Sequence, residues 1–241
     1  INSGEIKTVT LSTGEIFQTR TIIIATGAKW RTLNVPGEKE LIGKGVAYCP
    51  HCDGPFYQGK DVVVVGGGNS GIEAAIDLSN IAKNVKVIEF LPFLKADKIL
   101  RDKARSLENI SFILNSEVQT INDENGKVAG ITYIDKSSNE IYHLTTSAVF
   151  VQIGLIPNSS FVKNVVELNN YNEIIINDKC ETSQSGIFAC GDVSSIPHKQ
   201  IIVSMGNGAS AALSASDYLI KNESSVASIK EKTTAKKSRK K

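Results

Sequence analysis

The stretch that decides the fold is DVVVVGGGNSG, residues 61–71. Four consecutive valines without polar alternation predict a strand buried on both faces, as in a parallel sheet. The glycines that follow have the spacing G-x-G-x-x-G and lead into residues 70–83, whose apolar side chains repeat with helical period. Such a loop permits a tight turn and brings a pyrophosphate close to the free N–H groups of a helix N-terminus. We therefore predict a dinucleotide site, the alternative being a glycine-rich turn without a ligand, at Gly66, Gly68, Asn69, Ser70 and Gly71.

An acidic residue near the end of the next expected strand, residues 85–90, indicates which dinucleotide binds. Glu89 follows Gly71 by 18 residues, where a carboxylate can accept hydrogen bonds from a ribose 2′-hydroxyl and repels a 2′-phosphate. Residues 90–96 contain no arginine that could receive that phosphate. The pattern favours NADH over NADPH, and the alternative is a solvated carboxylate at a strand end.

A pair of cysteines stands just ahead of the dinucleotide motif, in Cys49-Pro-His-Cys52. Their spacing fits a reducible disulfide, whose reactive form is the thiolate, and His51 between them can stabilise that form. The alternatives are a zinc site and two unrelated buried thiols; the other cysteines, Cys180 and Cys190, are ten residues apart and supply no second C-x-x-C. Because Pro55 disfavours a continuing helix, the motif does not look like the one in a thioredoxin domain.

The stretch FACGD, residues 188–192, predicts a third site. A nicotinamide delivers a hydride whereas a disulfide is reduced through thiolates, and a flavin is the usual carrier between them. Asp192 follows a short strand and can hold a ribitol hydroxyl, while the helix expected over 200–220 can point its N-terminus at the flavin. The alternative is a capped helix beside a surface carboxylate.

The remaining pattern is that of an α/β protein with an internal repeat. A hairpin or meander, a hydrophobic strand ending in glycine and a proline-containing connector occur at 5–36 and again at 117–157. Only the second copy is accompanied by a complete strand–glycine–helix–strand unit. Further strands are expected at 5–11, 15–20, 21–27, 111–114, 117–122, 127–135, 141–146, 148–154, 173–177 and 187–190, and a helix at 98–107. The run 21–27 is expected to be buried on both faces.

Composition excludes several classes of protein. The 241 residues are 41% hydrophobic and 22% charged, which is ordinary for a globular chain, and no apolar run is long enough to span a membrane. The net charge of +2 is uneven, because residues 224–241 contain seven basic residues and one acid. The rest of the chain is mildly acidic, so an interaction with nucleic acid would depend on the tail alone and is not expected.

Together these motifs resemble the pyridine nucleotide–disulfide oxidoreductases of the thioredoxin reductase type, and most of all the flavoprotein subunits of alkyl hydroperoxide reductases. The resemblance extends from the first residues to about Asn222. Besides the glycine motif and Glu89, it is carried by CPHCDGP (49–55), GAKWR (27–31), VPG (35–37), EAAIDL (73–78), CGD (190–192) and KQII (199–202).

The resemblance implies a route for electrons. NADH would reduce FAD, FAD would reduce the disulfide of Cys49 and Cys52, and the dithiol would serve a thioredoxin-like domain and then a peroxiredoxin that destroys hydroperoxides. Asp53 would act as acid and base during thiol protonation, with His51 beside it. The residues implied at FAD are Thr26, Gly27, Gly191, Asp192, Gln200 and Ile201. The resemblance also implies a homodimer, and a catalytic rather than structural disulfide is compatible with the cytoplasm.

The resemblance and the repeat imply two dinucleotide-binding domains. Residues 32–152 would form a complete NAD-binding domain that carries the disulfide, and residues 1–31 with 153–221 would form part of an FAD domain. Residues 222–241 would be a basic disordered tail. The opening glycine-rich unit of the FAD domain and the thioredoxin-like domain have no counterpart, so we expect the chain to be a C-terminal fragment. Two other functions stay open: a thioredoxin reductase that uses NADPH, and a non-catalytic NADH-binding fragment.

Overall fold

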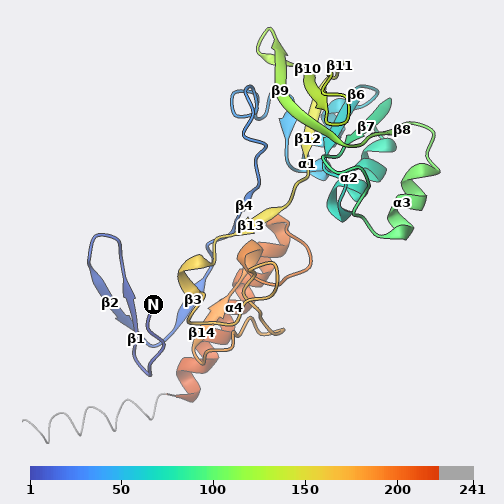
Figure 1. Ribbon diagram of the computed structural model, residues 1–241. Coiled ribbons are helices and arrows are strands. Elements are labelled where there is room, and N and C mark those ends of the chain that lie inside the picture. The colour runs from blue at the N-terminus through green and yellow to red at the C-terminus, as the bar shows by residue number, and fades with distance from the viewer. Residues whose placement is uncertain (223–241) are drawn as a thin grey trace, which may run out of the picture. The chain divides into compact units, whose positions relative to one another are not determined.

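The computed structural model describes residues 1–222 of the chain, which divide into two compact units (Figure 1). One unit consists of Ile1–Lys29 and the chain from Ile156 onward, and the other of Trp30–Leu155. The chain passes between them through β4 (Ala28–Trp30) and β13 (Leu155–Pro157), which pair with each other. The basic tail expected over 222–241 lies, apart from Asn222, outside the described residues.

The unit of residues 30–155 is built on a five-stranded parallel sheet. The strand order is β5-β12-β6-β7-β8, which places the valine run of β6 at the centre. Alternate valines of β6 pack into two different cores: Val62 and Val64 lie with α2, and Val63 and Val65 lie with a second, antiparallel sheet. The predicted burial on both faces is therefore confirmed for this strand. The parallel elements are β5 (Val46–Ala47), β6 (Asp61–Val65), β7 (Asn84–Ile88), β8 (Ile110–Ile113) and β12 (Ala148–Val151), with helices α2 (Asn69–Ser79) and α3 (Lys98–Arg105).

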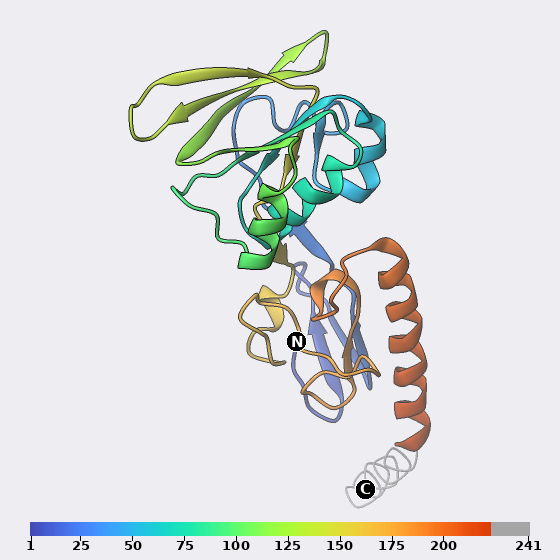
Figure 2. The ribbon, with the colours of Figure 1, turned by 90° about the vertical axis from the view of Figure 1, so that its right-hand side faces the viewer.

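The second sheet of this unit is the predicted meander. Its strands are β9 (Ser116–Glu124), β10 (Lys127–Asp135) and β11 (Ile141–Thr145), antiparallel in the order β11-β10-β9. Figure 2 shows this meander and the helices α2 and α3 on opposite faces of the parallel sheet. Each face of the parallel sheet is thus covered, as an all-parallel sheet requires.

The other unit has a smaller sheet and a long helix. The hairpin of β1 (Lys7–Thr10) and β2 (Ile16–Thr19) is followed by β3 (Ile22–Ile24), which pairs in parallel with β14 (Ile187–Ala189). Helix α4 (Ile201–Lys221) packs on β14, and two short 3₁₀ helices, η2 (Ser160–Val162) and η3 (Gly191–Val193), complete the unit.

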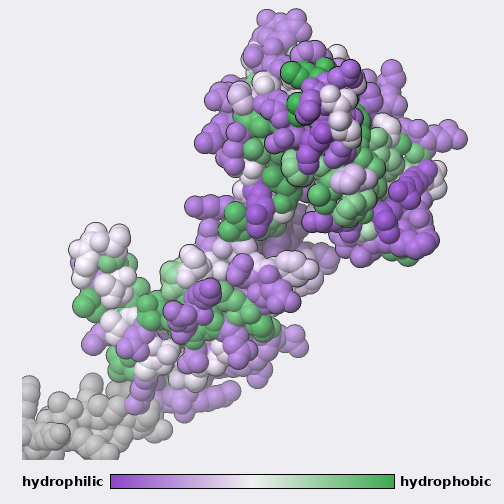
Figure 3. Space-filling model, viewed as in Figure 1, coloured by the Kyte–Doolittle hydropathy of each residue, from purple (hydrophilic) through white to green (hydrophobic). Residues whose placement is uncertain are grey.

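Two expectations for this unit are wrong. The run that contains β3 is not buried on both faces, because Ile23 is 42% exposed; within the described residues β3 pairs only with β14, so one edge of it lacks a neighbour. Figure 3 shows hydrophobic surface over this strand and the adjoining hairpin. The strand expected at 173–177 is reduced to isolated bridges of Ile174, and the side-chain oxygen of Asn177 accepts bonds from Lys179 N–H and Glu181 N–H in a local turn instead.

Candidate functional site

The glycines of the loop between β6 and α2 differ in whether a side chain would fit in their place. Gly66 has a φ of +122°, and a Cβ there would overlap the carbonyl oxygen of Gln152. A Cβ on Gly71 would overlap the carbonyl oxygen of Gly66, so only glycine lets the helix start this close to the strand. Around Gly68 a Cβ would meet nothing within 4 Å. Gly68 therefore borders open space, whereas Gly66 and Gly71 are required by packing.

Helix α2 begins beside this open space without a side-chain cap. Its N-cap is Gly68, which has no side chain to satisfy the first N–H groups of the helix. Asn69 does not fill that role, because its amide donates to Asp97 Oδ2 and its Oδ1 accepts from Asp97 N–H, both at 2.8 Å. The predicted residue Ser70 is exposed at this end of the helix. An anion can therefore take the uncapped N–H groups.

Glu89 lies at the same loop and is half-buried. Its Oε2 accepts a hydrogen bond from Gly67 N–H, and its Oε1 accepts one from Leu91 N–H at 2.9 Å. The carboxylate thus holds the glycine loop and the segment after β7 together. Each oxygen keeps a further lone pair, which is what a ribose hydroxyl would use.

The two cysteines of the C-P-H-C motif form a disulfide, with their Cα atoms 5.3 Å apart. Cys49 is the N-cap of α1 (Pro50–Asp53), and its sulfur accepts a hydrogen bond from Cys52 N–H at 3.3 Å. Cys52 is exposed and Cys49 is half-buried. By contrast Cys180 and Cys190 are free and buried, and burial raises the pKa of both thiols. The thiolate, which is the reactive form of cysteine, is therefore disfavoured at both of these buried residues.

Two titratable residues belong to the disulfide motif: His51, between the two cysteines, and Asp53, directly after them. Nδ1 of His51 lies 3.6 Å from Asp77 Oδ2 on α2, and both side chains are largely exposed. Asp53 ends α1 and precedes the 3₁₀ helix η1 (Gly54–Tyr57), which includes Pro55. Burial and the charge of Asp53 raise the pKa of Tyr57.

A buried carboxylate that the sequence analysis missed supports the residue before Cys49. Glu38 is fully buried and accepts hydrogen bonds from Leu33 N–H, Asn34 N–H and the hydroxyl of Tyr48. The amide of Gln152 donates to the carbonyl of Tyr48 at 2.8 Å. Burial and the bond to Glu38 raise the pKa of Tyr48 far above its ordinary value, so this hydroxyl stays a donor. The backbone that enters the disulfide is held from two sides.

In the other unit, the predicted flavin residues follow the carboxyl ends of two neighbouring parallel strands, β3 and β14. The hydroxyl of Thr26 donates to the carbonyl of Asn158 at 2.7 Å, and the amide of Asn158 donates back to the carbonyl of Thr26. Gly27 has a φ of +66°, and a Cβ there would meet nothing within 4 Å. Ligands of α/β sheets bind at this edge.

After β14, the chain turns at Gly191 (φ +70°) toward the start of α4. Gly191 N–H donates to Asn207 Oδ1 at 2.9 Å, and the hydroxyl of Ser204 donates to Asp192 Oδ1 at 3.1 Å. Both partners come from α4 and were missed by the sequence analysis; their spacing of three residues on one helix face was the available signal. The N-cap of α4, Gln200, makes no capping bond with its side chain, and Ile201 is 81% exposed.

The structure therefore brings the predicted residues together in two groups, one in each unit. Cys49, His51, Cys52 and Asp53 belong to the same unit as the glycine loop and Glu89. Thr26, Gly27, Gly191, Asp192, Gln200 and Ile201 belong to the other. Within residues 1–222 no three His, Cys, Asp or Glu side chains are grouped as a metal site, and no helix is long and apolar enough to cross a membrane.

The residues present fit both expected cofactors. The uncapped N-terminus of α2 beside Gly68 fits a pyrophosphate, and the carboxylate of Glu89 fits ribose hydroxyls. In the other unit, Asp192 Oδ2 makes no hydrogen bond within the described residues and is available to a ribitol hydroxyl. The start of α4 lacks a side-chain cap as well, so its first N–H groups can face an electron-rich group.

Comparison with known proteins agrees with this arrangement. Residues 1–216 match the family described as pyridine nucleotide-disulphide oxidoreductase. The chain is 50% identical over 220 residues to a subunit of the alkyl hydroperoxide reductase of Escherichia coli K12, covering 91% of this chain and 42% of that protein. It is 51% identical over 212 residues to a protein named NADH dehydrogenase of Bacillus subtilis 168, covering 88% of this chain and 42% of that one. The chain thus spans about two-fifths of the length of these relatives.

A solved structure supports the fold. Thioredoxin reductase from Streptococcus pyogenes MGAS5005 superposes with a TM-score of 0.85 at 37% identity, covering 92% of this chain and 72% of that one. The expected α/β, thioredoxin reductase-like fold is confirmed. The family match over most of the chain, the glycine loop with its carboxylate and the C-P-H-C disulfide lead to one conclusion: the chain belongs to the pyridine nucleotide-disulphide oxidoreductases.

Proposed function

We propose that this chain is the NADH-binding and dithiol-bearing part of a flavoprotein that reduces a peroxiredoxin. Electrons would pass from NADH through FAD and the Cys49–Cys52 disulfide to a thioredoxin-like domain, and from there to the peroxiredoxin that reduces hydroperoxides. The observation that carries the proposal is the Cys49–Cys52 disulfide, in the same unit as an uncapped glycine-loop helix. The names of the relatives in Escherichia coli and Bacillus subtilis support it.

The two domains would bind different cofactors. Residues 32–152 would bind NADH at Gly66, Gly68, Ser70, Gly71 and Glu89, and residues 1–31 with 153–221 would contribute to an FAD site. Asn69 would act there by fixing Asp97 at the start of α3, since both polar ends of its amide are already bonded. FAD, when bound, supplies the carrier between a two-electron hydride donor and a disulfide.

The chain's own residues would complete the transfer by thiol–disulfide exchange. One thiolate of the reduced pair attacks the partner's disulfide, so a mixed disulfide forms and one partner thiolate leaves. The second thiolate then attacks the chain's sulfur in that mixed bond, which re-forms the Cys49–Cys52 disulfide and releases the second partner thiolate. Two electrons have moved to the partner, and its thiolates each take a proton. Asp53, one residue after Cys52, would carry one of those protons.

The experiment that tests this function is a visible absorption spectrum of the 241-residue chain after incubation with FAD and removal of free cofactor. We expect a retained flavin band that NADH bleaches, followed by reduction of the Cys49–Cys52 disulfide measured by thiol titration. A retained band that NADH leaves unchanged would contradict the proposal. If no flavin is retained, the electron route belongs to a longer polypeptide, and binding of NADH with exchange by the chemically reduced dithiol decides what this chain contributes.

A thioredoxin reductase that uses NADPH is the second candidate, favoured by the superposition on the Streptococcus pyogenes enzyme. A substitution of Glu89 distinguishes the NADH-dependent function from the NADPH-dependent one. Replacing Glu89 by glutamine keeps its shape but removes its charge, so Gly67 N–H or Leu91 N–H loses its acceptor. We expect NADH affinity to fall by about tenfold, the equivalent of a charged hydrogen bond, and the preference for NADH over NADPH to shrink. Calorimetric titration with each nucleotide measures both, and a wild-type preference for NADPH would favour the second candidate.

The third candidate is a non-catalytic NADH-binding fragment. It predicts nucleotide binding without any dithiol exchange. Reduction of a small disulfide by the chemically reduced chain would exclude it, because that reaction needs the dithiol alone.

A further inference from the structure

Glu38 is a fully buried carboxylate that takes no part in the proposed electron route. Burying a carboxylate is costly unless hydrogen bonds replace those that water would make. Leu33 N–H and Asn34 N–H donate to it at 2.9 and 2.7 Å, and the hydroxyl of Tyr48 donates at 2.9 Å. One of the three donors that hold this buried charge is therefore the side chain next to Cys49.

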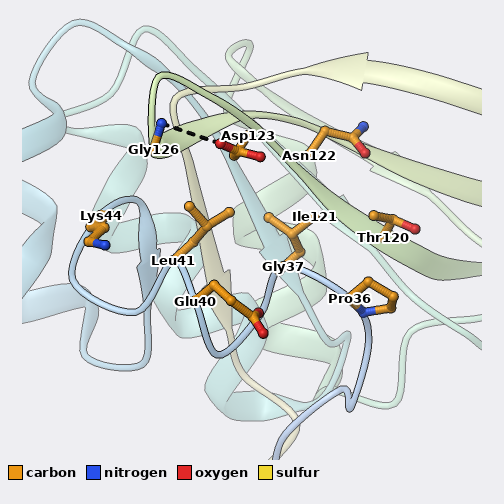
Figure 4. Close-up of a pocket in the computed structure, with 10 residues that line it drawn as sticks. All are labelled: Pro36, Gly37, Glu40, Leu41, Lys44, Thr120, Ile121, Asn122, Asp123 and Gly126. Atoms are coloured by element: carbon orange, nitrogen blue, oxygen red, sulfur yellow. Dashed lines mark hydrogen bonds between the residues drawn. The ribbon is translucent and has the colours of Figure 1, made fainter.

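The segment that carries Glu38 is fixed against β9. The carbonyl of Pro36 accepts a hydrogen bond from Ile121 N–H at 3.0 Å, and a Cβ on Gly37 would overlap the carbonyl oxygen of Ile121. Figure 4 shows a cavity of about 570 Å³ between this segment and the β9–β10 hairpin. Glu40 lines that cavity and is exposed, whereas Glu38 does not line it. Glu38 is thus an acceptor held inside the unit of residues 30–155.

Tyr48 is held at three points. Its hydroxyl donates to Glu38, and its carbonyl accepts from the amide of Gln152 at 2.8 Å. Its ring stacks on that of Trp30, with ring centres 5.9 Å apart and planes inclined by 22°. The bond from Gln152 joins residues that are 104 positions apart in the chain. The position of the backbone that leads into Cys49 therefore depends on the packed unit and not on the C-P-H-C motif alone.

The position of Cys49 matters because its sulfur accepts a hydrogen bond from Cys52 N–H at 3.3 Å. The thiolate is the reactive form of cysteine, and a hydrogen bond to the charged form favours that form. When the pair is reduced, Cys52 N–H can donate to a thiolate at Cys49 as long as the backbone before Cys49 stays in place.

Charged groups around the motif also act on this thiolate, so a test has to leave them unchanged. The titratable side chains of α1, and of α2 and η1 that pack against it, are His51, Asp53, Tyr57, Glu73 and Asp77. Asp53 also lines a cavity of about 600 Å³, in which the cationic lining residues are Lys44, Lys60 and Lys127.

We propose that Tyr48 is a positioning residue, which keeps the sulfur of Cys49 within reach of Cys52 N–H and so stabilises the reactive thiolate of the reduced pair. Its two anchors, Glu38 and Gln152, act through Tyr48. The inference rests on the proposed function, in which Cys49 is one of the two exchanging thiols.

The test is the pH dependence of Cys49 alkylation by iodoacetamide in the full 241-residue chain carrying C52S, which keeps the backbone N–H of residue 52. Mass spectrometry of the peptide that contains Cys49 gives the rate. We expect a midpoint below the value of about 8.5 for an ordinary cysteine. Y48F removes the hydroxyl donor and Q152M the amide donor, and neither changes a charge. Each should raise the midpoint by about 0.5 pH unit and lower the alkylation rate at pH 7 about threefold.

Y57F is the matched control. Tyr57 lies on η1, and its hydroxyl makes no hydrogen bond within the described residues, so the midpoint should equal that of C52S alone. In urea all unfolded variants should share one midpoint. The proposal is overturned by an unchanged midpoint in folded Y48F, by an equal shift in Y57F, or by a folded C52S chain with the midpoint of the unfolded one. If circular dichroism shows Y48F to be unfolded, Q152M decides by the same criteria.

A separate measurement tests the function on which the inference rests. The chain without substitutions is reduced with dithiothreitol, the reagent is removed, and single-turnover reduction of the small neutral bis(2-hydroxyethyl) disulfide is followed. If that reaction does not occur, the proposed function fails. The alkylation midpoints need neither flavin, nucleotide nor partner, so they decide the role of Tyr48 independently.

Discussion

Replacing Cys49 by serine is expected to lower disulfide reduction by about a thousandfold or more, to the background rate. The remaining thiol of Cys52 can form a mixed disulfide with a partner but has no second thiolate to release it. The substitution is structurally mild, because Cys49 is the N-cap of α1 and serine is among the preferred residues at that position. The measurement is the single-turnover rate of complete reduction of bis(2-hydroxyethyl) disulfide, that is, release of both of its thiols, together with mass spectrometry of the trapped adduct.

The matched control is Cys190→Ala. Cys190 is buried and burial raises the pKa of its thiol, so its reactive thiolate form is disfavoured, and we expect the rate of the control to equal that of wild type. NADH binding should be unaffected by Cys49→Ser. Complete reduction of the disulfide by Cys49→Ser at a rate close to that of wild type would refute the electron route and favour a non-catalytic role for the chain.

Replacing Gly71 by alanine is expected to destabilise the unit of residues 30–155 strongly. The added Cβ would overlap the carbonyl oxygen of Gly66, a backbone atom at the end of β6, so α2 has to move away from the strand. Overpacking of this kind costs about 1–3 kcal/mol or more, and we expect the thermal unfolding midpoint to fall by several degrees with loss of NADH binding. Thermal unfolding followed by circular dichroism measures the first effect, and calorimetry the second.

Gly68→Ala is the paired variant that separates folding from binding. Gly68 has a φ of −81°, and its added Cβ meets nothing within 4 Å, so stability should stay within about 0.5 kcal/mol of wild type. If the pyrophosphate approaches the loop at this point, the methyl group occupies its place, and NADH affinity should fall about tenfold or more. Unchanged NADH affinity in Gly68→Ala would show that the dinucleotide does not bind at this loop.

The core of the unit of residues 30–155 could be predicted because the residues that determine it are close together in the sequence. The valine run, the glycine loop and the helix over 69–79 follow one another in the chain. Each can be recognised from the backbone conformation that its residues allow or from the spacing of its apolar residues. The prediction for 21–27 was wrong because strand burial depends on neighbours. β3 has the same kind of apolar run as β6 but is paired on one edge only within the described residues.

Contacts between residues that are distant in the chain could not be predicted from the sequence. In the sequence Glu38 looks no different from the nearby acid Glu40, yet it is fully buried because two backbone N–H groups and the hydroxyl of Tyr48 converge on it. Asn207 holds Gly191 N–H from another element, and Lys60 and Lys127 line one cavity although they lie far apart in the chain.

By itself, the sequence determined the α/β class, the parallel strand that precedes the glycine loop, and the spacing of the two cysteines that form the disulfide. These follow from backbone conformations and side-chain types that neighbouring residues impose on one another. Only the tertiary structure decided that both oxygens of Glu89 bind the glycine loop and its neighbour, that β3 keeps an open edge within the described chain, and that three lysines share a cavity with Asp53. Each of these features depends on which distant segments the packed sheet brings within a few ångströms of one another. The order of residues along the chain does not specify those distances.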